Sequence, residues 1–228
     1  MPAEFDAYAR TYAEHLKDPF REQFASNSCF FANRKLLLIR EFFQRRAQDT
    51  RALSWIDLGC GQGELLRLGQ PHFAAVAGCD PSDRMIKECV NLNVRHQRVP
   101  DHIPFSDESF DLVTAVCVYH HVDVALRGAL AQEAVRVLKP GGIFCIIEHN
   151  PFNPITQLIV RRSPVDVNAR LLTADTAKRL SHAAGVQFIE TRYFLYFPER
   201  VYRSLAGLEN CLARTPLGGQ FAIFSRKS

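Results

Sequence analysis

Two short stretches place acidic and glycine residues where they could bind a small polar ligand. The first, WIDLGCGQG over residues 55–63, has the pattern of a buried strand that ends in Asp57 and continues into a glycine-rich turn. Such a turn lets the backbone approach a ligand at the N-terminus of the next helix. A dinucleotide-binding fingerprint reads G-x-G-x-x-G, but Glu64 occupies its last position. An acid before the glycines favours a ligand with an ammonium and a sulfonium group, such as S-adenosylmethionine.

The second stretch is GCDPSDRMI, in which Asp80 ends the next apolar run, 23 residues after Asp57. A carboxylate at the end of the second strand can accept hydrogen bonds from both hydroxyls of a ribose. The structural alternative is that such an acid only caps the following helix, although Ser82 could fill that role instead. Each stretch alone is moderate evidence, and the two in register are strong evidence for a nucleoside-bearing ligand.

Histidines and an acid follow the next two apolar runs and could take part in methyl transfer. The enzyme of such a reaction mainly aligns the acceptor with the methyl group, and a hydroxyl acceptor also needs a base. Histidine is the usual base near neutral pH. His120 and His121 follow one apolar run, and Glu148 and His149 end the next. These four residues are the candidate catalytic groups, although paired histidines there also commonly cap or pack the following helix.

The elements that position these residues alternate along the chain. Apolar runs of about six residues are separated by helical patterns, as in AAVAGCD followed by PSDRMIKECVNL. This alternation is typical of βαβ units and a parallel sheet. Right-handed crossovers then give a doubly wound α/β sheet with ligands at the C-terminal ends of its strands. After residue 170 the pattern predicts a helix, an apolar run, a helical excursion over about 198–216 and a last apolar run.

Five motifs in order carry a resemblance to a known family: D-x-G-x-G-x-G, G-x-D-P-S-x-x-M, IPFSDESFDLV, YHHV and RVLKPGG, over about residues 53–148. They resemble the class I S-adenosylmethionine-dependent methyltransferases, in the small-molecule branch similar to ubiquinone/menaquinone methyltransferases (methyltransferase type 11 domain). The resemblance implies a Rossmann-like, mostly parallel seven-stranded sheet with helices on both faces and an antiparallel last strand. It divides the chain into an N-terminal helical cap, 1–50, and a methyltransferase domain, 51–228, with an insertion over about 150–170.

The resemblance also implies roles for single residues, with S-adenosylmethionine as cofactor and S-adenosylhomocysteine as product. Asp57, Gly59 and Gly61 would hold the methionyl part, Asp80 the ribose, Met85 would pack near the adenosine, and the backbone near Cys117 would accept from the ammonium group. Cys60 and Pro81 lie within the same motifs and belong to the same predicted site.

One departure concerns the adenine. The family usually has an acid five residues before the proline of its L-P-F motif, but this chain has Val99 there, followed by Pro100 and Asp101. Either Asp101 takes the role after a small register change, or backbone and apolar contacts hold the adenine.

The turn EHNPFNPIT, residues 148–156, gathers polar side chains after the fifth predicted strand. The asparagine-proline grip of nucleic-acid and amide N-methyltransferases follows the fourth strand, so the position disfavours that interpretation. Asn150 and Asn153 could contact the acceptor, or they could belong to a stiff structural turn in which two prolines remove backbone donors. The sequence leaves both alternatives open.

An aromatic stripe at helical spacing runs through the N-terminal stretch EFDAYARTYAEHL. Such a stripe is most often plain packing. In this branch an N-terminal helix often closes over the pocket, so Tyr8 and Tyr12 are candidate acceptor contacts in a lid that excludes water.

Bulk properties limit the classes of partner. The chain has 228 residues, 47% of them hydrophobic, with no apolar stretch near the length of a membrane span and no secretory pattern at its start. Its seven cysteines form no CxxC pair, which predicts reduced thiols, no metal site and a cytoplasmic location. Residues 151–228 carry 11 Lys or Arg against 5 Asp or Glu. That excess is either a solvated surface or a site for an anionic partner, and no nucleic-acid-binding signature accompanies it.

The sequence therefore predicts an enzyme that methylates an oxygen or nitrogen of a small molecule, and an anionic or partly aromatic acceptor would fit. The alternatives are a macromolecular or lipid-linked glycan acceptor, and a non-catalytic module that only binds S-adenosylmethionine. The oligomeric state is not predicted.

Overall fold

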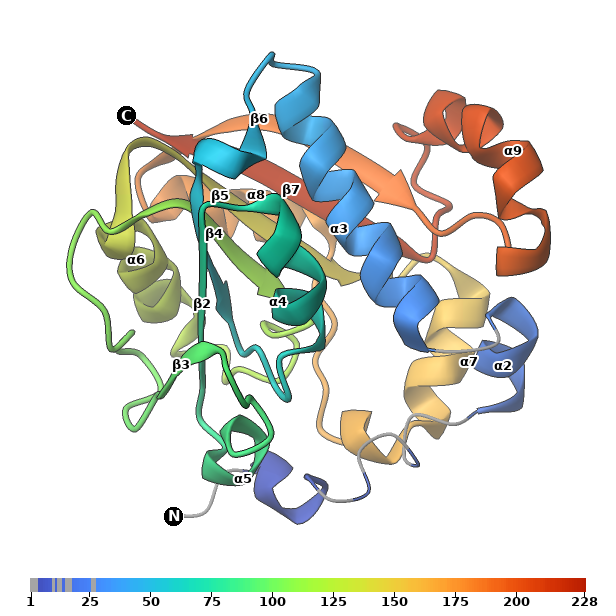
Figure 1. Cartoon of the computed structure of the whole chain (residues 1–228). Helices are drawn as coiled ribbons and strands as arrows, with labels where there is room; N and C mark the ends of the chain where they lie inside the picture. Colours follow the sequence, from blue (N-terminus) through green and yellow to red (C-terminus); the bar gives the residue numbers. More distant parts are fainter. Residues whose placement is uncertain (1–3, 10, 12–13, 15–17, 26–27) are drawn as a thin grey trace.

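A single seven-stranded sheet forms the centre of the molecule (Figure 1). The computed structural model describes residues 4–9, 11, 14, 18–25 and 28–228. The strand order is β3-β2-β1-β4-β5-β7-β6, with β7 antiparallel to both of its neighbours and all other pairs parallel. This confirms the predicted Rossmann-like sheet with its antiparallel last strand. The strands are β1 (Ser54–Leu58), β2 (Ala75–Asp80), β3 (Asn93–His96), β4 (Phe110–Val116), β5 (Leu138–His149), β6 (Val186–Phe194) and β7 (Gln220–Lys227).

Helices cover both faces of the sheet, as predicted. On one face α3 (Ser28–Gln44) and α4 (Glu64–Gly69) pack their apolar side chains, among them Phe42 and Leu66, against the strands. On the other face α6 (Arg127–Val137) and α8 (Ala174–Ala183) do the same. The apolar runs of β1, β4 and β5 are buried from both sides, which is why they lack the alternation of a half-exposed strand.

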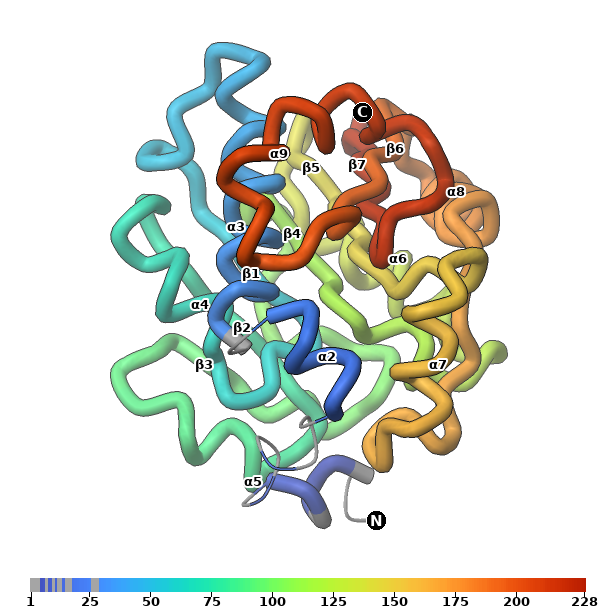
Figure 2. The backbone as a smooth tube through the Cα atoms, turned by 90° about the vertical axis from the view of Figure 1, so that its right-hand side faces the viewer, coloured from blue at the N-terminus to red at the C-terminus, as the bar shows by residue number. Residues whose placement is uncertain are grey.

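The remaining helical segments lie around the edges of this core. In Figures 1 and 2, η1 lies beside α5, and α2 lies beside α7. α7 and η4 occupy the predicted insertion after the fifth strand, and α9 occupies the predicted excursion. Their bounds are η1 (Glu4–Ala7), α2 (Pro19–Phe24), η2 (Thr50–Ala52), η3 (Gln70–His72), α5 (Asp83–Ile86), α7 (Pro154–Arg162), η4 (Pro164–Asp166) and α9 (Glu199–Leu212).

One predicted helix is shorter in the structure. The pattern PSDRMIKECVNL forms only the single turn of α5, and the chain then reverses at Asn91, whose φ is 63°. Val90 is 68% exposed there, so extending the helix through this residue would bury little apolar surface to stabilise it. In the N-terminal stretch EFDAYARTYAEHL, residues 4–7 form the 3-10 turn η1, and much of the rest of the predicted helix lies outside the described residues.

None of the helices in the described part of the chain is long and apolar enough to span a membrane. The seven cysteines are unpaired in the structure, and Cys29 and Cys211 are exposed.

Candidate active site

The glycine-rich turn after β1 has a backbone that requires glycine. Gly59 has φ 63°, and a Cβ there would lie 2.6 Å from a methyl carbon of Val118. Gly61 has φ 52°, and no other atom lies within 4 Å of the place a Cβ would take. Between them, the Cys60 amide donates to the Cys79 carbonyl of β2 at 3.1 Å. The turn is therefore fixed to β2 and presents open backbone at Gly61, as a ligand-binding loop must.

Asp57 lies at the C-terminal end of β1 and is almost fully buried. Thr114 of β4 donates its hydroxyl to Oδ1 of Asp57 at 2.5 Å, and Trp55 in turn donates to Thr114 at 2.8 Å. Burial raises the pKa of Asp57 to about 7, although the Thr114 hydrogen bond and the positive charge of Lys35 oppose the rise. A cationic ligand would relieve this cost of ionisation, so the site fits the ammonium-bearing end of S-adenosylmethionine.

Asp80 joins the end of β2 to the glycine turn. Its Oδ2 accepts from the amide of Gly61 at 2.8 Å, and its Oδ1 accepts from the amide of Ser82 at 2.8 Å, across Pro81. Ser82 itself caps α5, because its hydroxyl accepts from the amide of Met85 at 3.1 Å. Ser82, and not Asp80, is therefore the residue that caps this helix. Each Asp80 oxygen keeps a further lone pair for a ribose hydroxyl, and burial raises the pKa of the carboxyl.

The predicted adenine end is less defined. Met85 is buried beneath this edge. Gln97, at the end of β3, donates its amide to the carbonyl of Pro100 at 2.8 Å and fixes the turn that carries Asp101. Asp101 is half-buried in this turn. The geometry is compatible with both alternatives for holding the adenine, so the role of Asp101 stays a prediction.

Three predicted catalytic residues and one residue that the sequence did not indicate form an acid–histidine cluster. The predicted residues are His120, His121 and Glu148, and the fourth is Asp166. Glu148, fully buried at the end of β5, accepts from the amides of Val118 and Tyr119 at 3.1 and 2.7 Å. Its other oxygen lies 2.5 Å from Nδ1 of His120. Oδ1 of Asp166, from η4, lies 3.4 Å from Nε2 of both histidines. The structure therefore brings three of the four predicted catalytic residues into one cluster.

The charges in this cluster limit which residue can act as a base. Burial lowers the pKa of His120, but the carboxylates of Glu148 and Asp166 outweigh it and raise that pKa to about 10. Burial likewise raises the pKa of Glu148, and the neighbouring His120 more than offsets this and lowers it. At neutral pH His120 is therefore an imidazolium with no free base nitrogen. A base role is better suited to His149, because Nε2 of His121 faces Asp166 and its Nδ1 is buried.

A second group, the Cys117 cluster, lies beside the first and consists of Lys35, Cys117, His149 and Gln220. Cys117 directly follows β4 and has φ 57°, a conformation rare for residues other than glycine and common at functional sites. Nζ of Lys35 and Nε2 of Gln220 lie 3.7 and 3.3 Å from its sulfur. Gln220 also lies 3.4 Å from Nδ1 of His149. Burial raises the pKa of the Cys117 thiol, but Lys35 and His149 outweigh it and lower the pKa to about 6.

This shift predicts an unusually reactive thiol. Alkylation of Cys117 by iodoacetamide, followed by mass spectrometry across pH 5–9, should be half-maximal near pH 6, whereas an ordinary thiol titrates near about 8.5. The thiolate fraction at pH 7 would then be about 30 times that of an ordinary thiol. Lys35→Met should move the midpoint upward, and Cys117→Ser identifies the labelled peptide. A wild-type midpoint above pH 8 would contradict the charge arrangement described here.

The side chains of the EHNPFNPIT turn are used within the protein. Asn150 is buried and donates to the carbonyls of Pro216 and Gly218 at 3.0 and 2.8 Å. Asn153 caps α7 by accepting from Thr156 at 2.9 Å, and its amide donates to Leu217. These contacts tie the turn to the segment before β7. They favour the stiff structural turn over a contact with the methyl acceptor. The side-chain NH₂ of Asn150 already donates to two backbone carbonyls and is not free for a substrate.

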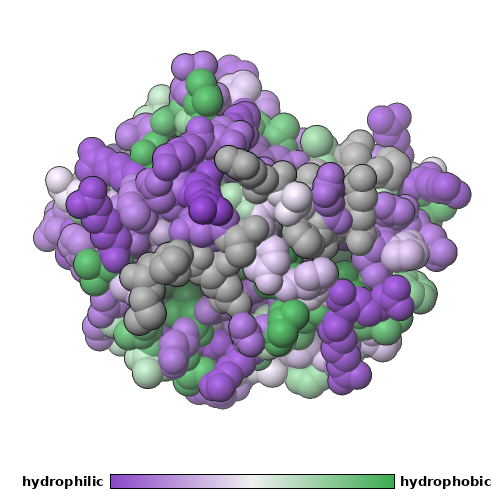
Figure 3. Space-filling view, turned by 90° about the horizontal axis from the view of Figure 1, so that it is seen from below, coloured by the Kyte–Doolittle hydropathy of each residue, from purple (hydrophilic) through white to green (hydrophobic). Residues whose placement is uncertain are grey.

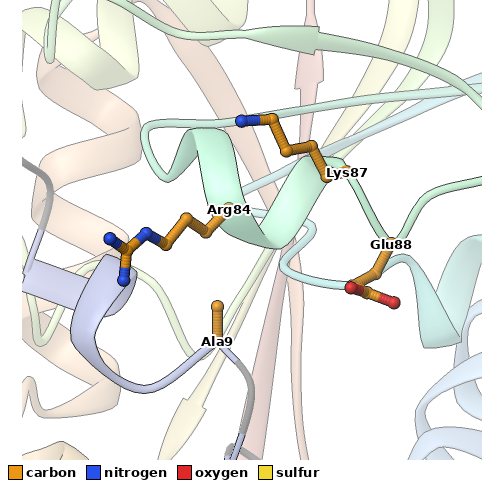
Figure 4. A pocket seen from close by; sticks show the side chains of 4 residues that line it. All are labelled: Ala9, Arg84, Lys87 and Glu88. Atoms are coloured by element: carbon orange, nitrogen blue, oxygen red, sulfur yellow. The ribbon is translucent and has the colours of Figure 1, made fainter.

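The N-terminal segment lies over the edge where the strands end. Asp6 accepts from the Ser82 hydroxyl at 2.6 Å, and the Phe5 ring packs edge-on against His121 with centroids 4.8 Å apart. Tyr8 is half-buried next to Phe5, whereas Tyr12 lies outside the described residues. A hollow of about 380 Å³ lies between this segment and α5. It is lined by Ala9, Arg84, Lys87 and Glu88, whose side chains are labelled in Figure 4.

Sequence reasoning missed several residues of the site. Asp166 and Gln220 belong to no motif, and only the fold brings η4 and β7 to the end of β5. Lys35 is one of two adjacent cations, with Arg34, within the largely apolar stretch FFANRKLLLI, which is a weak signal that could have been noticed. Phe5 is part of the predicted aromatic stripe, but the sequence does not indicate that it, rather than Tyr8, contacts a histidine.

The fold and the site together define a class. A doubly wound sheet whose first two strands end in buried acids around a glycine turn is the architecture of the class I S-adenosylmethionine-dependent methyltransferases. Residues 56–146 match a family model described as "Methyltransferase domain", so this part of the chain is a methyltransferase domain of that class. S-adenosylmethionine is the cofactor of the class, and the two acids and the open glycine turn fit it.

Curated relatives match the same part of the chain. The tRNA (carboxymethyluridine(34)-5-O)-methyltransferase of Arabidopsis thaliana is 33% identical over 113 residues, which is 48% of this chain and 27% of that protein. The demethylmenaquinone methyltransferase of Tropheryma whipplei is 36% identical over 98 residues, 41% of this chain and 40% of that protein. The matches thus span less than half of either relative, and the two relatives have different acceptors.

Solved structures share the fold over nearly the whole chain. A Thermotoga maritima methyltransferase described as a possible histamine N-methyltransferase superposes with a TM-score of 0.69 at 18% identity, covering 98% of both chains. An S-adenosylmethionine-dependent methyltransferase of Archaeoglobus fulgidus gives 0.61 at 20% identity, covering 91% of this chain and 98% of the other. At such identities the likeness concerns the fold alone.

Proposed function

We propose that this protein transfers a methyl group from S-adenosylmethionine to an oxygen or nitrogen of a small-molecule acceptor. The observation that carries the proposal is the convergence of Asp57, Asp80 and the open backbone of Gly61 at one sheet edge, next to the acid–histidine cluster. The cofactor would bind on the first group, and the acceptor would lie against the second.

The residues of the chain supply binding and alignment. When bound, S-adenosylmethionine supplies an activated methyl group on a sulfonium. Asp57 would face its cationic amino-acid end, and Asp80 would hold the ribose while it fixes the glycine turn. The acid–histidine cluster gives the acceptor a rigid wall, which favours a near-attack geometry. For a hydroxyl acceptor, His149 would accept the proton that the reaction releases.

The size of the acceptor is inferred from the N-terminal segment. Phe5 on His121 and Asp6 on Ser82 place this segment across the strand ends, where it would exclude water and bulky acceptors. Figure 3 views the molecule from below, the side on which Figure 1 shows η1 and α5, and there hydrophilic and hydrophobic residues are mixed. A small, partly apolar acceptor suits this arrangement.

A macromolecular acceptor is the second candidate. Two observations favour it: residues 151–228 have an excess of basic residues, and a tRNA methyltransferase is among the relatives. Binding to RNA would depend strongly on salt, because each phosphate contact releases counterions.

The test separates these candidates by the fraction that becomes labelled. Purified protein would be incubated with methyl-labelled S-adenosylmethionine and with separated small-molecule, RNA and protein fractions of a cell extract, at low and moderate salt. Label in the small-molecule fraction, unaffected by salt, is the expected result. Salt-sensitive label in RNA would favour the second candidate. No label in any fraction, with S-adenosylhomocysteine binding intact, would favour a non-catalytic binding module.

A further inference from the structure

We propose that His120, His121 and Asp166 bind one divalent transition-metal ion, Zn²⁺ by preference, with a fourth coordination position left open. The sequence predicts no metal site, and neither the family match nor the relatives assign one. The binding of the ion stands on the geometry of the chain alone. Its role, which is to orient a polar acceptor atom, rests on the proposed function.

Two of the three separations between the candidate ligand atoms match those of tetrahedral coordination. Oδ1 of Asp166 lies 3.4 Å from Nε2 of His120 and 3.4 Å from Nε2 of His121, and all three ligand atoms lie within 4.8 Å of one another. Ligands at about 2.0–2.1 Å from a tetrahedral Zn²⁺ are separated by about 3.4 Å. The observed spacing therefore leaves room for an ion at the centre of the three atoms.

Glu148 supplies the outer contact that metal-binding histidines usually have. Such a histidine donates its second ring N–H to a carboxylate or carbonyl, which fixes the tautomer and the ring orientation. Nδ1 of His120 lies 2.5 Å from Oε2 of Glu148, so Nε2 is the nitrogen directed at Asp166. The other Glu148 oxygen is held by the amides of Val118 and Tyr119. His120 is thus held in a fixed orientation by Glu148, which is itself held by two backbone amides.

A metal-free arrangement of hydrogen bonds is the alternative explanation of the cluster. In the metal-free protein a proton on His120 takes the place of the ion, and metal binding must displace it. Each histidine would then donate its own N–H to the same Asp166 oxygen atom. The separation of 3.4 Å in both contacts is longer than the roughly 2.7–3.2 Å of a good N–H···O hydrogen bond, and one ion between the three atoms would account for both distances.

Three protein ligands with an open position are the arrangement of catalytic rather than structural zinc sites. The cluster lies between the Cys117 cluster, where the His149 ring is 5.3 Å from that of His120, and the Phe5 ring over His121. The open position would therefore face the space assigned to the acceptor. Two imidazoles and one carboxylate also suit Fe²⁺ or Co²⁺, so the choice of ion follows geometry and availability.

The test measures metal binding directly, without an activity assay. Tag-free protein would be dialysed against a chelator and titrated with Zn²⁺ by calorimetry, and with Co²⁺ by its visible absorption. We expect one ion per chain and the absorption of tetrahedral Co²⁺. His121→Ala and Asp166→Asn should each weaken binding by at least about 10–100-fold, the loss typical even for an outer-shell partner.

His102→Ala is the matched control. His102 forms an exposed pair with Glu133 at 3.0 Å, so it offers the same two kinds of ligand without a third, and its loss should leave metal binding unchanged. Absence of Zn²⁺ binding, or equal binding by His121→Ala and Asp166→Asn, would overturn the proposal. S-adenosylhomocysteine binding measured in the same samples separates the two hypotheses. If it persists without metal binding, only the metal proposal fails; if metal binds and the nucleoside does not, only the proposed function fails.

Discussion

Asp80→Ala is expected to abolish binding of S-adenosylhomocysteine in a thermal-shift or calorimetric titration. Wild-type protein should gain about 2.7 kcal/mol of stability when the product is present at about 100 times its dissociation constant. The variant loses the carboxylate that would hold both ribose hydroxyls, and it also releases the Gly61 amide that shapes the turn. Charged hydrogen bonds contribute about 1.5–3 kcal/mol each. A loss of about 100-fold or more in affinity follows from the two ribose contacts.

Asp83→Ala provides a matched control for this measurement. It removes a carboxylate three residues away, from the exposed side chain of Asp83 on α5, which forms an ion pair with Lys87. Affinity should then stay close to that of the wild type. The unliganded stability of Asp80→Ala must be measured separately, because the amides of Gly61 and Ser82 lose their acceptor at a cost of about 1–3 kcal/mol. A folded Asp80→Ala variant that binds within threefold of the wild type would contradict the cofactor site.

Glu148→Ala is expected to lower the free energy of unfolding by about 3–5 kcal/mol, the cost typical of removing one partner from a buried ion pair. Glu148 is fully buried and accepts from two amides and from His120. Without it, a buried imidazolium and two backbone donors lose their partner together. Urea denaturation followed by circular dichroism would measure the change, provided that the transition remains cooperative.

Two further variants make the result interpretable. Glu148→Gln keeps the shape and one acceptor oxygen, so it should recover part of the stability but not the interaction with His120. Glu190→Ala removes a carboxylate from a partly exposed pair with Arg45 at 2.6 Å, and about 1 kcal/mol or less should be lost. If Glu148→Ala cost no more than Glu190→Ala, the acid–histidine cluster would not be the rigid wall that the proposed function requires.

The sequence by itself determined the sheet and the positions of the residues proposed to hold the cofactor. The alternation of buried runs and helices predicts a doubly wound sheet because parallel strands covered on both faces must be continuously apolar. Asp57, Asp80 and the glycine turn were predictable for a related reason. Each is positioned by the strand directly before it, so local sequence is sufficient to place it at the C-terminal edge.

Only the tertiary structure brought together the residues that are proposed to contact the acceptor. His120, His121 and Glu148 come from two strand ends that sequence order places side by side, but Asp166 comes from η4, 45 residues after His121. No periodicity encodes that approach, because it depends on how α7 and η4 fold back over the sheet edge. The same holds for Asn150 and Asn153, whose amides are satisfied by the segment before β7. Their role depends on backbone groups more than 60 residues away in the chain, and those groups are identified by the packed structure.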